Sequence, residues 1–118
     1  MINKITDSNF ESIVYISHIY QNKQENLDIV ANKIRELQKE YPTYLFISPM
    51  HMFQMLYDVV DYDKGMEFCL FMLEKCDEMW VVCSKDKAEE SVGVQREIEY
   101  CKEFGIPYYY CEEVGNSD

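Results

Sequence analysis

Short apolar runs alternate with longer segments of mixed polarity along this chain of 118 residues. Each run is short and rich in β-branched or aromatic residues, as expected of a strand that is buried on both faces of a parallel sheet. The pattern predicts strands at 12–17, 44–48, 79–82 and 107–111.

The segments between these runs predict helices. Apolar residues recur every three or four positions in the clearest one, and Pro42 ends it, because the residue before proline avoids the helical conformation. Ser91 is a good N-cap for the last helix, which Gly105 should end. Two helices are expected between the second and third strands, and residues 84–90 are expected to form a charged loop. The helices with the clearest bounds are 26–41, 65–76 and 91–104.

The order β-α-β-αα-β-α-β predicts an α/β fold, a three-layer sandwich around four or five parallel strands. The length fits one domain over residues 1–118, with 1–11 and 112–118 expected to fray. In open sheets of this class, ligands bind at the carboxyl ends of the strands. The stretch 76–106 contains such an end and the helix that follows it, so we expect function to lie there.

Composition narrows the classes of partner. A formal net charge of -11 disfavours nucleic-acid polymers, which normally bind basic patches, but it allows a single nucleotide in a local pocket. No apolar run approaches the roughly 20 residues that cross a bilayer, and the N-terminal residues lack the apolar core of a signal peptide. Five cysteines without a CxxC pair are expected to be core residues in a reducing compartment. A cytoplasmic protein without a membrane partner is therefore expected.

Glu97 is the main candidate for chemistry. It lies three residues after Val94 and four before Cys101, so it borders or joins the inward face of the last predicted helix. The start of a helix helps to keep a half-buried carboxylate ionised. Such a group could act as a nucleophile or hold a ligand hydroxyl. The alternative is a boundary residue whose aliphatic part packs while its carboxylate reaches water.

Other polar residues should lie at the same edge of the sheet. Tyr15, Ser17 and His18 lie in or just after the first predicted strand, and His51 follows the second. Asp77, at the start of the third strand, is expected to be structural. The two histidines lack further ligands at a matching spacing, so no metal is expected. The glycines are isolated, so neither a dinucleotide-binding fingerprint nor a P-loop is present, and no cofactor is expected.

Several blocks of the sequence resemble one family. VYIS and SPMH, and more specifically CDEMWVV, SVGVQREI and GIP, are similar to the nucleoside 2-deoxyribosyltransferase-like superfamily and its DUF4406-type domains. The resemblance spans about residues 13–111 and implies a doubly wound, flavodoxin- or Rossmann-like sheet. It implies that Glu97 is the nucleophile that attacks C1′ of a nucleoside and displaces the base. It also places Tyr15, Ser91 and Gly93 with the substrate.

The sequence departs from that family at two places. The transferases carry an Asp six residues before the nucleophile, where this chain has Ser91, and a hydroxyl cannot replace the acid near neutral pH. Their glycine-rich turn after the first strand is here 17–20, Ser-His-Ile-Tyr. The transferases complete their sites from a neighbouring subunit, so the resemblance also implies a homo-oligomer.

Three hypotheses on function follow. The first is a transferase or hydrolase acting on the N-glycosidic bond of a nucleoside or nucleotide, with Glu97 as nucleophile. The second is a binding module with the same pocket and no chemistry, which recognises a nucleotide-derived ligand. The third is a structural or interaction protein that kept the fold and lost the pocket. A Glu97 that is inaccessible to solvent or held in a salt bridge would favour the third hypothesis.

Overall fold

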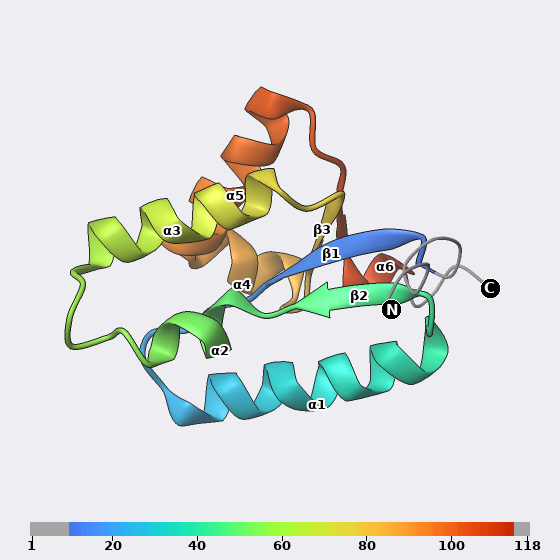
Figure 1. Cartoon of the computed structure of the whole chain (residues 1–118), viewed down its shortest axis with the longest axis horizontal. Coiled ribbons are helices and arrows are strands. Elements are labelled where there is room, and N and C mark those ends of the chain that lie inside the picture. The colour runs from blue at the N-terminus through green and yellow to red at the C-terminus, as the bar shows by residue number, and fades with distance from the viewer. Residues whose placement is uncertain (1–9, 115–118) are drawn as a thin grey trace, which may run out of the picture.

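A computed structural model describes residues 10–114 and confirms an α/β fold around one parallel sheet (Figure 1). The predicted strands all form, with bounds within one or two residues of those expected. The strands are β1 (Ser12–Ser17), β2 (Tyr44–Ile47), β3 (Glu78–Val81) and β4 (Tyr108–Tyr110). The helices are α1 (Gln24–Glu40), α2 (Pro49–Gln54), α3 (Tyr62–Glu74), α4 (Lys85–Glu90), α5 (Val92–Phe104) and α6 (Cys111–Val114).

The described sheet has the strand order β2-β1-β3-β4, and every neighbouring pair is parallel. The chain moves outward from β1 to β2, then returns across β1 to β3 and continues to β4 at the opposite edge. The direction of winding therefore reverses between β1 and β3, as in a doubly wound fold. At this point Ser17, the last residue of β1, is in register with Val81, the last residue of β3.

Helices cover both faces of the sheet (Figure 1). Successive side chains of a strand point to opposite faces. Val14 and Ile16 of β1 therefore pack in the core cluster that contains Val30 of α1. Tyr15 packs in the other cluster, which contains Leu73 of α3 and residues of α4 and α5. Two apolar layers thus hold the sheet, and α5 lies on the Tyr15 side.

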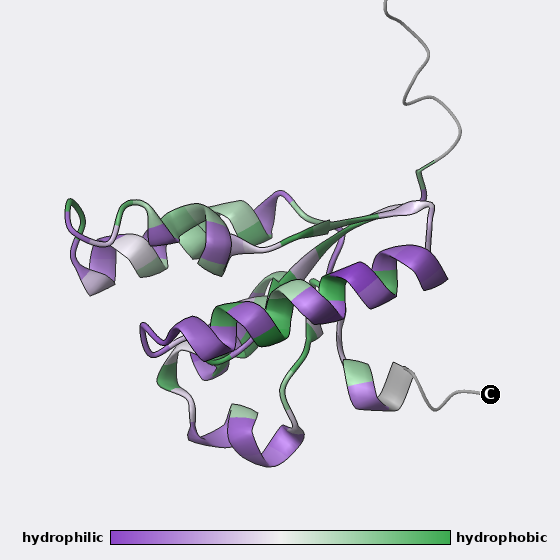
Figure 2. Cartoon of the chain, turned by 90° about the horizontal axis from the view of Figure 1, so that it is seen from below, coloured by the Kyte–Doolittle hydropathy of each residue, from purple (hydrophilic) through white to green (hydrophobic). Residues whose placement is uncertain are grey.

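The pattern of α1 follows the prediction closely. Leu27, Val30 and Leu37 are buried, and the helix ends one residue before Tyr41. Figure 2 looks onto this helix and shows hydrophilic residues alternating with hydrophobic ones along it. The helix is held by its apolar stripe, as expected of a surface helix on a sheet.

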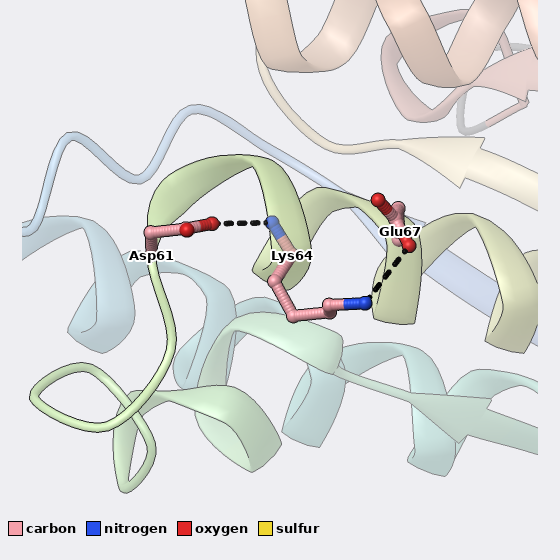
Figure 3. Close-up of polar contacts among 3 residues, drawn as sticks. All are labelled: Asp61, Lys64 and Glu67. Carbon is pink, nitrogen blue, oxygen red and sulfur yellow. Dashed lines mark hydrogen bonds and ion pairs between the residues drawn. The ribbon is translucent and has the colours of Figure 1, made fainter.

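The helix α3 begins three residues earlier than predicted. The Asp61 carboxylate accepts a hydrogen bond from the backbone N–H of Lys64 at 2.8 Å, and so caps the helix. Lys64 also forms an ion pair with Glu67 at 3.3 Å (Figure 3). The polar residues 61–64 are therefore the N-cap and first turn of the helix.

The prediction of a charged loop at 84–90 is wrong, because these residues form α4 and its N-cap. The Ser84 hydroxyl accepts a hydrogen bond from the Lys87 N–H at 3.3 Å, and Ala88 is fully buried. A single small residue anchors this helix, so no apolar stripe marks it. Similarly, 111–114 form the short helix α6, where fraying was expected from residue 112. Fraying was also expected at residue 11, but the Glu11 N–H donates a hydrogen bond to the Thr43 carbonyl at 2.8 Å. The segments 1–9 and 115–118 lie outside the described residues.

Asp77 has the structural role that was expected, at the end of the sheet away from the candidate site. Its carboxylate accepts a hydrogen bond from the Ile13 N–H at 2.7 Å and joins the starts of β1 and β3. None of the helices in the described part of the chain is long and apolar enough to cross a membrane.

Candidate functional site

Glu97 lies on the inward face of α5, at the carboxyl end of the sheet. The Ser91 hydroxyl accepts a hydrogen bond from the Val94 N–H at 3.2 Å, which fixes the start of the helix. The apolar stripe of Val94, Ile98 and Cys101 then packs against the sheet. Glu97 lies within this stripe and is 8% exposed. The carboxyl thus lies in the core and not at its boundary, and this low exposure is the observation expected to favour the third hypothesis, a structural or interaction protein.

Two hydroxyl groups of β1 hold the Glu97 carboxylate. The Tyr15 hydroxyl donates a hydrogen bond to Oε2, and the Ser17 hydroxyl donates one to Oε1 at 2.6 Å. Tyr15 and Ser17 point to the same face because they are two residues apart on a strand. Both side chains are almost completely buried. Each carboxylate oxygen therefore has a fixed partner on the neighbouring sheet.

The environment of Glu97 opposes ionisation, whereas the start of the helix was expected to help keep the carboxylate ionised. Burial raises the pKa of this carboxyl from 4.5 to about 7, while the hydrogen bonds from Ser17 and Tyr15 act in the opposite direction. Among the ion pairs of the described residues, none includes Glu97. Near neutral pH the protonated and ionised forms are therefore both present, as suits a group that exchanges a proton or acts on a ligand.

Cys69 is a residue of this site that the sequence analysis assigned to the core. It lies on α3, beside the Tyr15 hydroxyl and close to Glu97. Burial, and next the charge of Glu97, raise the pKa of its thiol to about 11, so it stays protonated. Burial also raises the pKa of Tyr15 well above its ordinary value, with the Glu97 charge as the next cause. Both groups can therefore donate hydrogen bonds near neutral pH.

His18 and His51 have local partners. The Nδ1 atom of His18 lies 2.7 Å from the carbonyl oxygen of Ile19, and burial lowers the pKa of its imidazole. The Nδ1 atom of His51 lies 2.6 Å from the Ser48 hydroxyl. Neither contacts Glu97 through a hydrogen bond recorded in the described chain. No group of three or more metal-ligating side chains occurs among the described residues.

Ser91 and Gly93, which the resemblance placed with the substrate, lie at the start of α5. The hydroxyl of Ser91 is used in the helix cap and lines a groove on the outer surface of the helical layer. A Cβ atom at Gly93 would lie 3.6 Å from the Tyr62 hydroxyl, an ordinary contact, so the local packing does not require glycine. The structure thus brings together Tyr15, Ser17 and Glu97, while Ser91 and Gly93 lie at the start of α5.

The arrangement leaves Glu97 with chemical capacity. Each carboxylate oxygen has about two lone-pair sites, and Tyr15 and Ser17 use one on each. The remaining sites could accept a ligand hydroxyl or attack an electrophilic carbon. Two surface grooves of the chain are lined by other residues, so Glu97 does not open into either of them.

The chain belongs to the family described as "Domain of unknown function (DUF7768)", which matches residues 12–111. This match covers β1 through β4. It therefore includes Tyr15, Ser17 and Glu97, which together form the Glu97 cluster. No curated protein and no solved structure matches the chain. The family description names no activity, so the resemblance to nucleoside 2-deoxyribosyltransferases stays a prediction.

Proposed function

We propose that the chain acts on the N-glycosidic bond of a nucleoside or nucleotide, with Glu97 as the nucleophile. The observation that supports this proposal best is the placement of one buried carboxylate, held on both oxygens by Tyr15 and Ser17, at the switch point of a doubly wound sheet. Switch points are where such folds bind ligands. Keeping an acid in a core without a cation costs stability, and such sites are often functional.

In the proposed reaction a Glu97 oxygen attacks C1′ of the sugar. The bond between C1′ and the base nitrogen breaks, and the base leaves with the electron pair and takes up a proton from water. A glycosyl ester of Glu97 remains, which water hydrolyses or a second base attacks at C1′. The two hydrogen bonds orient the carboxylate and disperse its charge, while the spare lone pairs perform the attack.

Burial sets a condition on this mechanism. Glu97 is 8% exposed, so a substrate must gain access past the end of β1, where His18 is only half-buried. Hydrogen bonds and access in catalytic sites often reach their working geometry only with the substrate bound. We expect the side chains after Ser17 to move when the ligand binds.

The test is release of the free base from a panel of ribonucleosides, deoxyribonucleosides and their monophosphates, with and without a second base as acceptor. Base release should disappear in Glu97→Gln and persist in Glu99→Gln, which changes an exposed residue of the same helix. Steady turnover by Glu97→Gln would remove Glu97 as nucleophile. Absence of base release from every member of the panel would exclude the transferase and hydrolase proposals together.

The pH profile gives a second test. A nucleophile must be ionised, and burial raises the pKa of Glu97 to about 7, so activity should rise with pH through this region. The Tyr15→Phe variant lacks a hydrogen bond that stabilises the ionised form. Its profile should therefore shift to higher pH, whereas a purely structural role of Tyr15 would lower activity equally at every pH.

A binding module is the second candidate, and the position of Ser91 favours it. Where the transferases carry an acid, this chain has a hydroxyl that caps α5, so the acid that assists the departing base is missing at this position. This candidate predicts that a nucleotide-derived ligand raises the melting temperature and is recovered intact. Glu97→Gln would then weaken binding, and no base would be released by either protein.

A homo-oligomer is part of the proposal, because a neighbouring subunit could supply the missing acid. Exposed apolar side chains between α2 and α3 support it, with Met55 74% and Val59 69% exposed. Sedimentation equilibrium should show a dimer or larger assembly that Met55→Asp weakens. We also propose a cytoplasmic location, which the five free thiols support.

A further inference from the structure

A groove on the outer surface of the helical layer has no part in the Glu97 cluster. It encloses about 480 Å³ and lies where α5 meets the end of α4 and one side chain of α3. This layer covers the face of the sheet opposite α1 (Figure 1). The lining consists of Leu70, Glu89, Glu90, Ser91, Val92, Gln95, Arg96, Glu99, Tyr100 and Glu103.

An apolar strip runs along the groove. Val92 is 68% exposed, and Tyr100 lies on the same face of α5 two turns later, with Leu70 of α3 beside them. The Tyr100 hydroxyl donates a hydrogen bond to Glu74 at 3.1 Å, which holds the ring against α3. Phe104, 58% exposed, packs on Tyr100 with 4.5 Å between ring centroids and extends the strip beyond the groove. Exposed apolar side chains gathered in and beside a groove are a feature of interaction sites.

The rim of the groove is acidic. Glu89, Glu90, Glu99 and Glu103 are all exposed, against a single basic side chain in the lining, Arg96. That arginine lies 3.9 Å from the carboxylate of Asp63, so its charge is already offset. The groove therefore combines an apolar floor with a negative rim, and it complements a positively charged partner.

We propose that this groove binds a basic amphipathic helix of a partner protein. At about 1.5 Å per residue, the stretch of α5 from Val92 to Glu103 measures roughly 16 Å, which is three helical turns. An apolar stripe at i, i+3, i+4 and i+7 would lie on Val92 and Tyr100, and flanking lysines or arginines would meet the glutamates. A second copy of the chain would bring like-charged rims together, and anionic lipid or nucleic acid would be repelled.

The probe is a synthetic helical peptide with leucines at those spacings and lysines elsewhere. Its binding to the full chain is measured by fluorescence anisotropy and by shifts of backbone amide resonances. The test variant is Glu99→Lys with Glu103→Lys. The control is Glu36→Lys with Glu40→Lys on α1. In both variants the two glutamates are four residues apart and lie near the C-terminal end of their helix. The first glutamate of each pair also forms an ion pair with a lysine three residues away.

The groove variant should weaken binding of the peptide at least tenfold, and the control should change it less than twofold, although both alter the net charge equally. Amide shifts should cluster on α5 and Leu70. Equal weakening by the two variants would show general charge attraction and would overturn the proposal. So would absence of binding at low salt, shifts centred on α1, or a dimer of the free chain that Val92→Asp dissociates.

Discussion

Glu97→Gln should make the protein more stable at alkaline pH while leaving its stability at acidic pH nearly unchanged. In the folded chain, burial raises the pKa of this carboxyl from 4.5 to about 7. The unfolded chain therefore loses the proton first as pH rises. The contribution of Glu97 to stability is fully present below about pH 4.5 and is lost as pH rises through about 7. The amide of glutamine has no proton to lose, so the variant avoids this loss.

The size of the effect follows from the pKa difference. At about 1.4 kcal/mol for each pKa unit, the rise from 4.5 to about 7 corresponds to a loss of about 3 kcal/mol of unfolding free energy. This is a large part of the roughly 5–15 kcal/mol that stabilises an ordinary domain. Glutamine keeps an oxygen and an N–H group for the two hydroxyls of Tyr15 and Ser17, which rotate to suit it.

The measurement is urea unfolding of wild type and variant at steps between about pH 4 and pH 9. The free energy of unfolding of Glu97→Gln minus that of wild type should grow by about 3 kcal/mol over this range. Glu99→Gln, an exposed change on the same helix, should differ from wild type by less than about 0.5 kcal/mol at each pH. A difference for Glu97→Gln that stays constant with pH would refute the reasoning.

Substitutions at four further positions test how the site is supported. Ser91→Ala should cost about 1 kcal/mol, because the Val94 N–H loses its cap, and Ser91→Thr should restore most of it; urea unfolding measures both, and equal loss in both variants would contradict the cap. Gly105→Ala should cost about 1 kcal/mol, because φ is 71°. Gly93→Ala, in the first turn of α5, should be stabilising by at most about 1 kcal/mol. The melting temperatures of the two variants should therefore shift in opposite directions. Leu73→Ala should cost about 2–5 kcal/mol through the cavity it leaves, since Leu73 is fully buried in the cluster that contains Tyr15; a loss below about 1 kcal/mol would show that the core closes over the gap.

The inward position of Glu97 could be predicted, because helical spacing relates it to Val94 and Cys101 without any tertiary information. Its partners could not be fixed in the same way. Alternation along β1 places Tyr15 and Ser17 on one face but does not say which helix covers that face. The path of the chain across the sheet decides this, and the crossovers bring α5 onto the Tyr15 side.

Two features of the structure, the helix α4 and the place of Cys69 in the site, could not be predicted from the local sequence pattern. The helix α4 buries one small residue, Ala88, so the hydrophobic periodicity that identifies most helices is absent, and only the Ser84 cap was available as a signal. Cys69 reads as one apolar residue among many on α3. Its place beside Tyr15 depends on how α3 crosses the sheet, and spacing within one helix does not contain that information.

If Glu97 is functional, Glu97→Gln should raise the unfolding free energy above neutral pH and lower base release or ligand binding. These two measurements together distinguish the hypotheses. If the Glu97 carboxyl contributed net stability through its hydrogen bonds to Tyr15 and Ser17, Glu97→Gln would lower the unfolding free energy at every pH. A residue kept for chemistry or binding sits in the core at a cost, as the pKa of about 7 indicates. Gain of stability above neutral pH together with loss of base release or ligand binding would therefore identify a functional carboxylate. Gain of stability without any loss of base release or ligand binding would support the third hypothesis, a chain that kept the fold and lost the pocket.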